Sequence, residues 1–246
     1  MSQTHAAARQ LGSVHQDWRG DIKAAARVWA AVLLAGVVLG VVVVGVMSRL
    51  VMLLLASMNP AAAGVRSDDG FVMGQFTLSG SAQLAGAGAQ IGAIAAFLYV
   101  AVRALMIGPG WFRLLSISVG PGVVVGSLLV HTNGVDFTLL EPTWLTIGSF
   151  VLLPVVFCTA LHLLAEKAVR DGGVRSKPLQ VLGLLLAAVT FPLSLTLGIG
   201  WWVTRQLRLR ENQSTWLWAW TIRAALALVF VLAVAKLVSD ARTLSA

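Results

Sequence analysis

The sequence predicts an all-α protein, an integral membrane helical bundle of about six transmembrane helices. Of the 246 residues, 58% are hydrophobic and 11% are charged, whereas soluble domains average about 45–50% apolar and about 25% charged residues. The apolar residues fall in six runs that are long enough to cross the ~30 Å hydrocarbon core of a bilayer. Tryptophans lie near the ends of several runs, at the membrane interface that this side chain prefers. Most of the chain is therefore expected to be surrounded by lipid.

The polar and basic segment 1–27 precedes the first apolar run. Its alanine-rich, helix-favouring stretches predict a short cytoplasmic helix that lies partly in the membrane interface. Trp18 and Trp29 would then lie near the headgroups.

The first apolar run, 28–48, is 21 residues long before it meets Arg49. A signal peptide has an apolar core of only about 7–15 residues, so we interpret the run as an anchored transmembrane helix. Apolar residues resume from Leu50 to Met58. If the helix continues to Met58 it is about 45 Å long, and it must tilt or project beyond the bilayer.

The segment 49–77 is the longest polar interruption of the chain. It breaks the helical pattern at Asn59-Pro60 and then presents Arg66 and Asp68-Asp69-Gly70. An Asp-Gly pair predicts a turn. The alternative is a divalent cation bound by Asp68 and Asp69, which the absence of further spaced carboxylates makes the weaker interpretation.

The remaining apolar runs complete the predicted bundle, with a kink expected at Pro121 and a turn at Asn133-Gly134. A polar tail, 239–246, follows the last run. The six predicted spans are 28–48, 82–105, 111–130, 144–164, 179–202 and 216–238.

Small residues spaced four apart recur along three of the predicted spans. Such spacing lets helices approach closely, so we expect these faces to pack within the bundle; a homodimer face is the alternative. The ladders are Gly36-x-x-x-Gly40, Gly88-x-x-x-Gly92-x-x-x-Ala96 and Gly122-x-x-x-Gly126.

The distribution of basic residues predicts an orientation in the cell membrane. With the N-terminus in the cytoplasm, six crossings place most of the 18 lysines and arginines on the cytoplasmic side, as the positive-inside rule requires, and return the C-terminus to the cytoplasm. Segment 203–215, which carries Arg205, Arg208 and Arg210, would then face outward. Either it lies along the outer headgroups, or run 179–202 does not cross.

The few polar side chains predict a pocket at the outer end of the bundle. Arg49 lies near the outer boundary, and Arg223, seven residues past Trp216, would lie about 10 Å deep from the same face. We expect both arginines to meet one or more of the outer acids, Asp68, Asp69, Asp136 and Glu141. In the alternative, Arg49 reaches the interface, Arg223 pairs structurally and the acids are solvated.

His162 is a candidate for a proton relay, but a hydrogen bond to a neighbouring helix is the simpler interpretation. The single cysteine, Cys158, excludes an intrachain disulfide and a cysteine-based zinc site, and we interpret it as a core residue. No cofactor and no metal site are predicted. The formal charge of +8 is attributed to membrane topology and anionic lipid, so no nucleic-acid partner is expected.

Three stretches resemble those of uncharacterised multi-pass membrane proteins from actinobacteria: SRLVMLLLASMNP, SDDGFVMGQFTLSG and VVVGSLLVHTNGVDFTLLEPTWL. The resemblance covers roughly residues 28–165. It implies a helical membrane fold in a bacterial inner membrane, and it implies no activity.

Three functions remain open from the sequence. The leading hypothesis is a non-enzymatic accessory, scaffold or envelope-sensing protein, with the bilayer and a protein partner or a second copy as its partners. The second is a small-solute or ion transporter with Arg49, Arg223 and His162 along its path. The third is a membrane-embedded enzyme that uses a metal at Asp68 and Asp69. A cavity that reaches His162 from the outer acids would favour transport. A carboxylate cluster that faces a lipid-accessible groove would favour an enzyme. A closed bundle would favour the accessory, scaffold or sensing protein.

Overall fold

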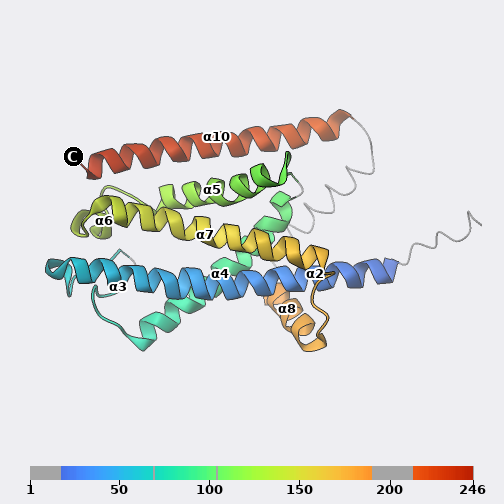
Figure 1. The fold of residues 1–246 in the computed structure, drawn as a ribbon, viewed down its shortest axis with the longest axis horizontal. Helices are drawn as coiled ribbons and strands as arrows, with labels where there is room; N and C mark the ends of the chain where they lie inside the picture. Colours follow the sequence, from blue (N-terminus) through green and yellow to red (C-terminus); the bar gives the residue numbers. More distant parts are fainter. Residues whose placement is uncertain (1–17, 69, 104, 190–212, 246) are drawn as a thin grey trace, which may run out of the picture.

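The computed structural model describes residues 18–68, 70–103, 105–189 and 213–245, and the regular elements among them are all helical (Figure 1). Five helices are long and apolar enough to cross a membrane, which confirms the all-α membrane character. The fifth predicted span, 179–202, is described only as far as Val189, and its remainder lies outside the described residues. The elements are α2 (Trp18–Leu39), η1 (Gly40–Met47), α3 (Ser48–Met58), η2 (Pro60–Ala62), α4 (Leu78–Arg103), α5 (Gly110–Leu129), α6 (Val135–Leu139), α7 (Thr143–Arg170), α8 (Lys177–Val189) and α10 (Gln213–Leu244).

The first long helix runs without a break through α2, the π-helical segment η1 and α3. It therefore continues past Arg49 to Met58. It ends at Asn59, whose φ of −126° and ψ of 73° leave the helical region; Pro60, which follows, lacks the backbone N–H that a further turn would need.

Glycine ladders set the crossing between this helix and α4. A Cβ atom on Gly36 would meet the backbone of Gly92, and one on Gly40 would meet the backbone of Gly88. The same holds in reverse for Gly88 and Gly92. The two backbones are in direct contact because no side chain separates them, so these ladders pack within the bundle, as expected from the sequence.

A third glycine ladder brings α5 against α7. Cβ atoms on Gly122 and Gly126 would collide with the side chains of Val155 and Val151. The main core lies between these crossings and contains Leu33, Phe97, Phe157 and Leu161 among its buried side chains.

The bundle has two chemically different ends. We call one the basic end; it contains the start of α2, the end of α4, the start of α5 and the end of α7. Its basic residues include Lys23, Arg27, Arg103, Arg113, Lys167, Arg170, Arg175 and Lys177. The other, the loop end, is formed by segments 59–77 and 131–142 (Figure 1).

The direction of α10 follows from two of its cationic side chains. Arg223 Nε donates to Leu105 O at 2.9 Å, at the basic end. Lys236 Nζ donates to Ser127 O at 2.6 Å and to Val130 O at 3.1 Å, at the loop end. Helix α10 therefore starts at the basic end and finishes at the loop end, so Trp18 and Leu244 lie at opposite ends of the bundle, whereas six crossings would bring them to the same end (Figure 1).

Candidate functional site

Arg49 is buried at the loop end, with 6% of its surface exposed. Its Nη2 donates to Gln75 O at 2.5 Å, and its guanidinium lies 5.4 Å from the centre of the Phe71 ring. Its Nε is buried without a hydrogen-bond partner. Arg49 therefore binds segment 59–77 to α3 and does not reach out to the interface.

Asp68 holds the short helix α6. Its two carboxylate oxygens accept hydrogen bonds from Val135 N at 3.1 Å and Asp136 N at 3.4 Å. These are amides at the N-terminus of α6, where backbone donors have no intrahelical partner and a negative charge is favoured. The Asp68 carboxylate, which was predicted to line a pocket or to bind a cation, thus joins two loop segments. The neighbouring Asp69 lies outside the described residues.

Glu141 is fixed through its backbone. Asn59 Nδ2 donates to Glu141 O at 2.8 Å, and Asn59 Oδ1 accepts from Glu141 N at 2.9 Å. The side chain that ends the first long helix therefore also fixes the segment leading into α7.

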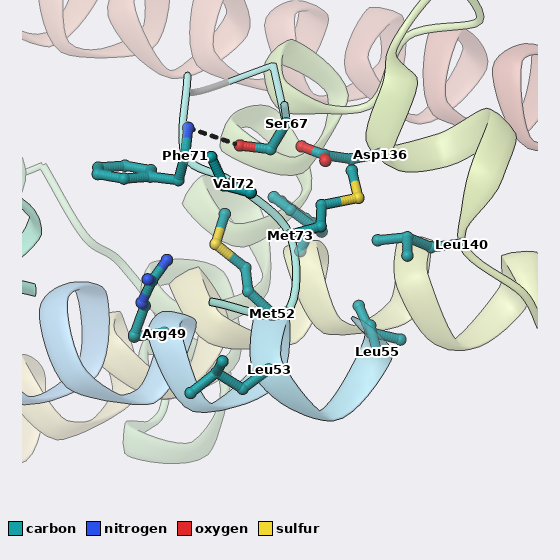
Figure 2. A pocket seen from close by; sticks show the side chains of 12 residues that line it. Arg49, Met52, Leu53, Leu55, Ser67, Phe71, Val72, Met73, Asp136 and Leu140 are labelled. Carbon is teal, nitrogen blue, oxygen red and sulfur yellow. Dashed lines mark hydrogen bonds between the residues drawn. The ribbon is translucent and has the colours of Figure 1, made fainter. Parts of the chain in front are cut away.

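A cavity of about 20 Å³ lies between Arg49 and Asp136. Figure 2 shows the two residues on different sides of the pocket, with Met52 and Met73 between them. Asp136 is 5% exposed, and the volume suffices for about one water molecule. The structure thus brings Arg49, Asp68, Asp136 and Glu141 to the loop end. Of these four, Arg49 and Asp136 line the cavity, which is too small for a solute.

Arg223 and His162 lie at the other end. Arg223 bonds the carbonyl of Leu105 and lies 5.1 Å from the centre of the Trp220 ring. The predicted meeting of Arg223 with the outer acids is therefore wrong, because α10 runs in the direction opposite to the one that six crossings imply.

His162 belongs to a hydrogen-bonded network that joins α4 and α7. Tyr99 Oη lies 3.0 Å from His162 Nδ1 and donates to Glu166 Oε1 at 3.1 Å. Arg103 donates from Nε to Glu166 Oε1 at 2.6 Å and from Nη2 to Glu166 Oε2 at 3.1 Å. This bidentate contact fixes both the Glu166 carboxylate and the Arg103 guanidinium.

The network forms one wall of a cavity of about 1020 Å³ at the basic end. Helices α2, α4, α5 and α7 all contribute to its lining. Its apolar wall includes Trp29, Val32, Val100, Met106 and Leu163. The cavity is only partly enclosed, and its volume is large enough to hold a small-molecule ligand.

Arginines dominate the charge of this cavity. Arg103 is neutralised by Glu166. Arg27, Arg113 and Arg170 also line the cavity, and no carboxylate among the described residues lies within 4.0 Å of any of them. The Nε atom of Arg27 is buried without a hydrogen-bond partner. The site can therefore accept negative charge from a ligand.

Sequence reasoning identified only His162 of this site. Two features of the sequence could have pointed to the site. Tyr99 is the single tyrosine of the chain, and Glu166 is an acidic residue next to a predicted span. The arginines were attributed to topology alone, because their convergence from four helices depends on the packing. No group of three or more His, Cys, Asp or Glu side chains suited to a metal occurs among the described residues.

Comparisons of the chain with models of known families, with curated proteins and with solved structures find no match.

Proposed function

We propose that the chain is a polytopic membrane protein that binds an anionic ligand in the basic-end cavity, as an accessory or sensing protein and without converting the ligand. The observation that carries this proposal is the set Arg27, Arg113 and Arg170 around a space of about 1020 Å³, with no ion-pair partner among the carboxylates whose side chains the structure describes. Guanidinium groups make strong, paired hydrogen bonds with carboxylates and phosphates. Like charges on one cavity wall repel one another, so an anion relieves their repulsion.

The basic end faces the cytoplasm in this proposal. Positive side chains concentrate there, at the ends of α4 and α7 and the starts of α2 and α5, and the positive-inside rule assigns such an end to the cytoplasmic side of a bacterial inner membrane. The loop end and Leu244 then face outward. Segment 59–77, fixed by Arg49, Asn59 and Asp68, supplies a defined outer surface.

Transport of a small solute or ion is the alternative function, and one observation favours it: His162 lines the cavity. A pathway would also have to reach the acids of the loop end. Between the two ends lie buried core side chains such as Leu33, Val43 and Phe97, which supports binding over passage. The metal-dependent enzyme has the least support, because the Asp68 carboxylate accepts hydrogen bonds from two backbone amides.

Thermal unfolding in a neutral detergent tests anion binding. We expect anionic amphiphiles or organic phosphates to raise the Tm of the wild type by several degrees, because a ligand that binds only the folded state stabilises it. Arg113→Gln should reduce this rise. Arg175→Gln, an exposed basic residue of the same end that lies outside the cavity lining, should keep it. A wild-type Tm that no anion of either kind raises would contradict the proposal.

A further inference from the structure

We infer that the ligand of the basic-end cavity is a membrane lipid with a phosphate headgroup, which enters sideways from the bilayer. This inference rests on the proposed function and names the class of its anion. It depends on how charge, apolar surface and exposure are arranged around the cavity.

Part of the apolar wall lies further along the bundle axis than the arginines, whereas Met106 and Val169 lie at their level. On α2, Arg27 precedes Trp29 and Val32, which line the cavity further from the basic end. On α7, Arg170 lies eight residues beyond His162, roughly 12 Å along the helix. An amphiphile that lies along this axis would place its headgroup among the arginines and its chain against the apolar wall.

The first turn of α5 adds to the preference for an anion. Gly110, the first residue of this 20-residue helix, lines the cavity, and the first turn of α5 holds no acidic side chain. The unpaired backbone N–H groups of a helix N-terminus favour negative charge. Together with Arg27, Arg113 and Arg170, this end supplies more donors than the two oxygens of one carboxylate can accept, which favours a phosphate group.

The cavity is only partly enclosed, and we place its opening beside α7. Leu163 lines the cavity and is also 55% exposed. In a membrane this face of α7 meets acyl chains, so the apolar part of the cavity is open to lipid. Basic sites between transmembrane helices on the cytoplasmic side are suited to anionic lipid headgroups.

Three ligands that share parts of one structure test the inference. Phosphatidic acid carries the phosphate and the acyl chains, phosphatidylcholine carries the chains with a zwitterionic headgroup, and glycerol 3-phosphate carries the phosphate without chains. Binding to the full chain in neutral detergent would be measured by native mass spectrometry and by the shift of Tm. We expect phosphatidic acid to bind at least about tenfold more tightly than the other two, the effect of about one charge-assisted hydrogen bond.

Two variants separate the headgroup contact from the lateral opening. Arg113→Gln should weaken phosphatidic acid binding about tenfold, and Arg175→Gln should not. Leu163→Trp should narrow the opening and weaken binding of the lipid without changing that of glycerol 3-phosphate. Its control is Leu152→Trp, on the same helix, 59% exposed and outside the cavity lining.

The outcomes distinguish the two proposals. Equal binding of glycerol 3-phosphate and phosphatidic acid, both sensitive to Arg113→Gln, would overturn the lipid inference and leave a soluble anion as the ligand. Equal loss of lipid binding in the two tryptophan variants would overturn the lateral entry. If none of the phosphates binds, or Arg113→Gln changes nothing, both the inference and the anion site are wrong.

Discussion

At the scale of single residues, the polar side chains of the loop end hold the fold. Asp68 supplies hydrogen-bond acceptors to the start of α6, and Asn59 pairs with both backbone groups of Glu141. Arg49 bonds Gln75 O from a buried position. That these residues lie on one side of the bundle was predictable from the apolar runs. Their partners were not, because backbone amides and carbonyls leave no mark in the sequence.

Asp68→Ala should lower the stability of the loop end by about 1 kcal/mol, the usual effect of losing a carboxylate from a helix N-terminus. Thermal unfolding would show a lower Tm for Asp68→Ala. Asp68→Asn keeps one acceptor oxygen, so its Tm should fall less. The cation hypothesis makes a different prediction, namely that EDTA lowers the Tm of the wild type and has no further effect on Asp68→Ala. A wild-type Tm that EDTA lowers would support a metal bound at Asp68.

The most instructive error at this scale concerns Arg223. Its depth from Trp216 follows from helical rise alone, but the side of the membrane depends on the number of crossings before it. Hydropathy does not show the direction of a helix, so an apolar run fits both directions equally well. The hydrogen bond from Arg223 to Leu105 O decides the direction.

At the scale of elements, the crossing between η1 and α4 depends on missing side chains. Gly40 and Gly88 meet through their backbones. The ladders in the sequence were sufficient to predict close approach, since this spacing has few other uses in a membrane helix. Which ladders face each other required the structure.

Gly88→Val should therefore destabilise the bundle by about 1–3 kcal/mol or more, because the added carbons collide with the backbone of Gly40. Gly86 offers a matched control two residues away on α4, since a Cβ there meets nothing within 4 Å. Thermal unfolding in detergent should give a clearly lower Tm for Gly88→Val and a Tm close to that of the wild type for Gly86→Val. Equal effects would mean that glycine acts through backbone flexibility and that the crossing contributes little.

Helix α10 is the least enclosed of the five candidate spans, with 6% of its most apolar window buried. Two cationic side chains attach its ends to the bundle, Arg223 to the carbonyl after α4 and Lys236 to carbonyls at the end of α5. Lys236 also pairs with Asp240 at 2.7 Å. Positive charge at the C-terminus of a helix is favourable. Arg223 and Lys236 therefore attach α10 to the ends of α4 and α5, a role that their sequence positions alone do not indicate.

At the scale of the whole molecule, five described helices are long and apolar enough to cross a membrane, and five crossings would carry the chain from one side to the other. The sequence predicted the helical membrane class, which the five long apolar helices confirm. The sixth crossing was the weak step, because it left Arg205, Arg208 and Arg210 on the outside. Helix α7 ends and α10 begins at the same end of the bundle, and these three arginines lie outside the described residues.

Cysteine labelling in intact cells tests this topology. In a Cys158→Ser background, Ser245→Cys should react with a membrane-impermeant maleimide from outside, whereas Ser176→Cys should react only after the membrane is opened. Both positions are exposed, so a difference reports the side of the membrane. Labelling of neither position in intact cells would place both on the cytoplasmic side and favour six crossings.

The unbroken helix from Ile22 to Met58 runs between the two ends of the bundle. Its 37 residues extend over roughly 55 Å; one end carries Arg27 and Trp29 in the cavity wall, and the other carries Arg49 beneath segment 59–77. The glycine contact with α4 lies between them, beside core side chains that include Leu33 and Phe97. This one continuous helix therefore connects the wall of the basic-end cavity directly to the loop end of the bundle.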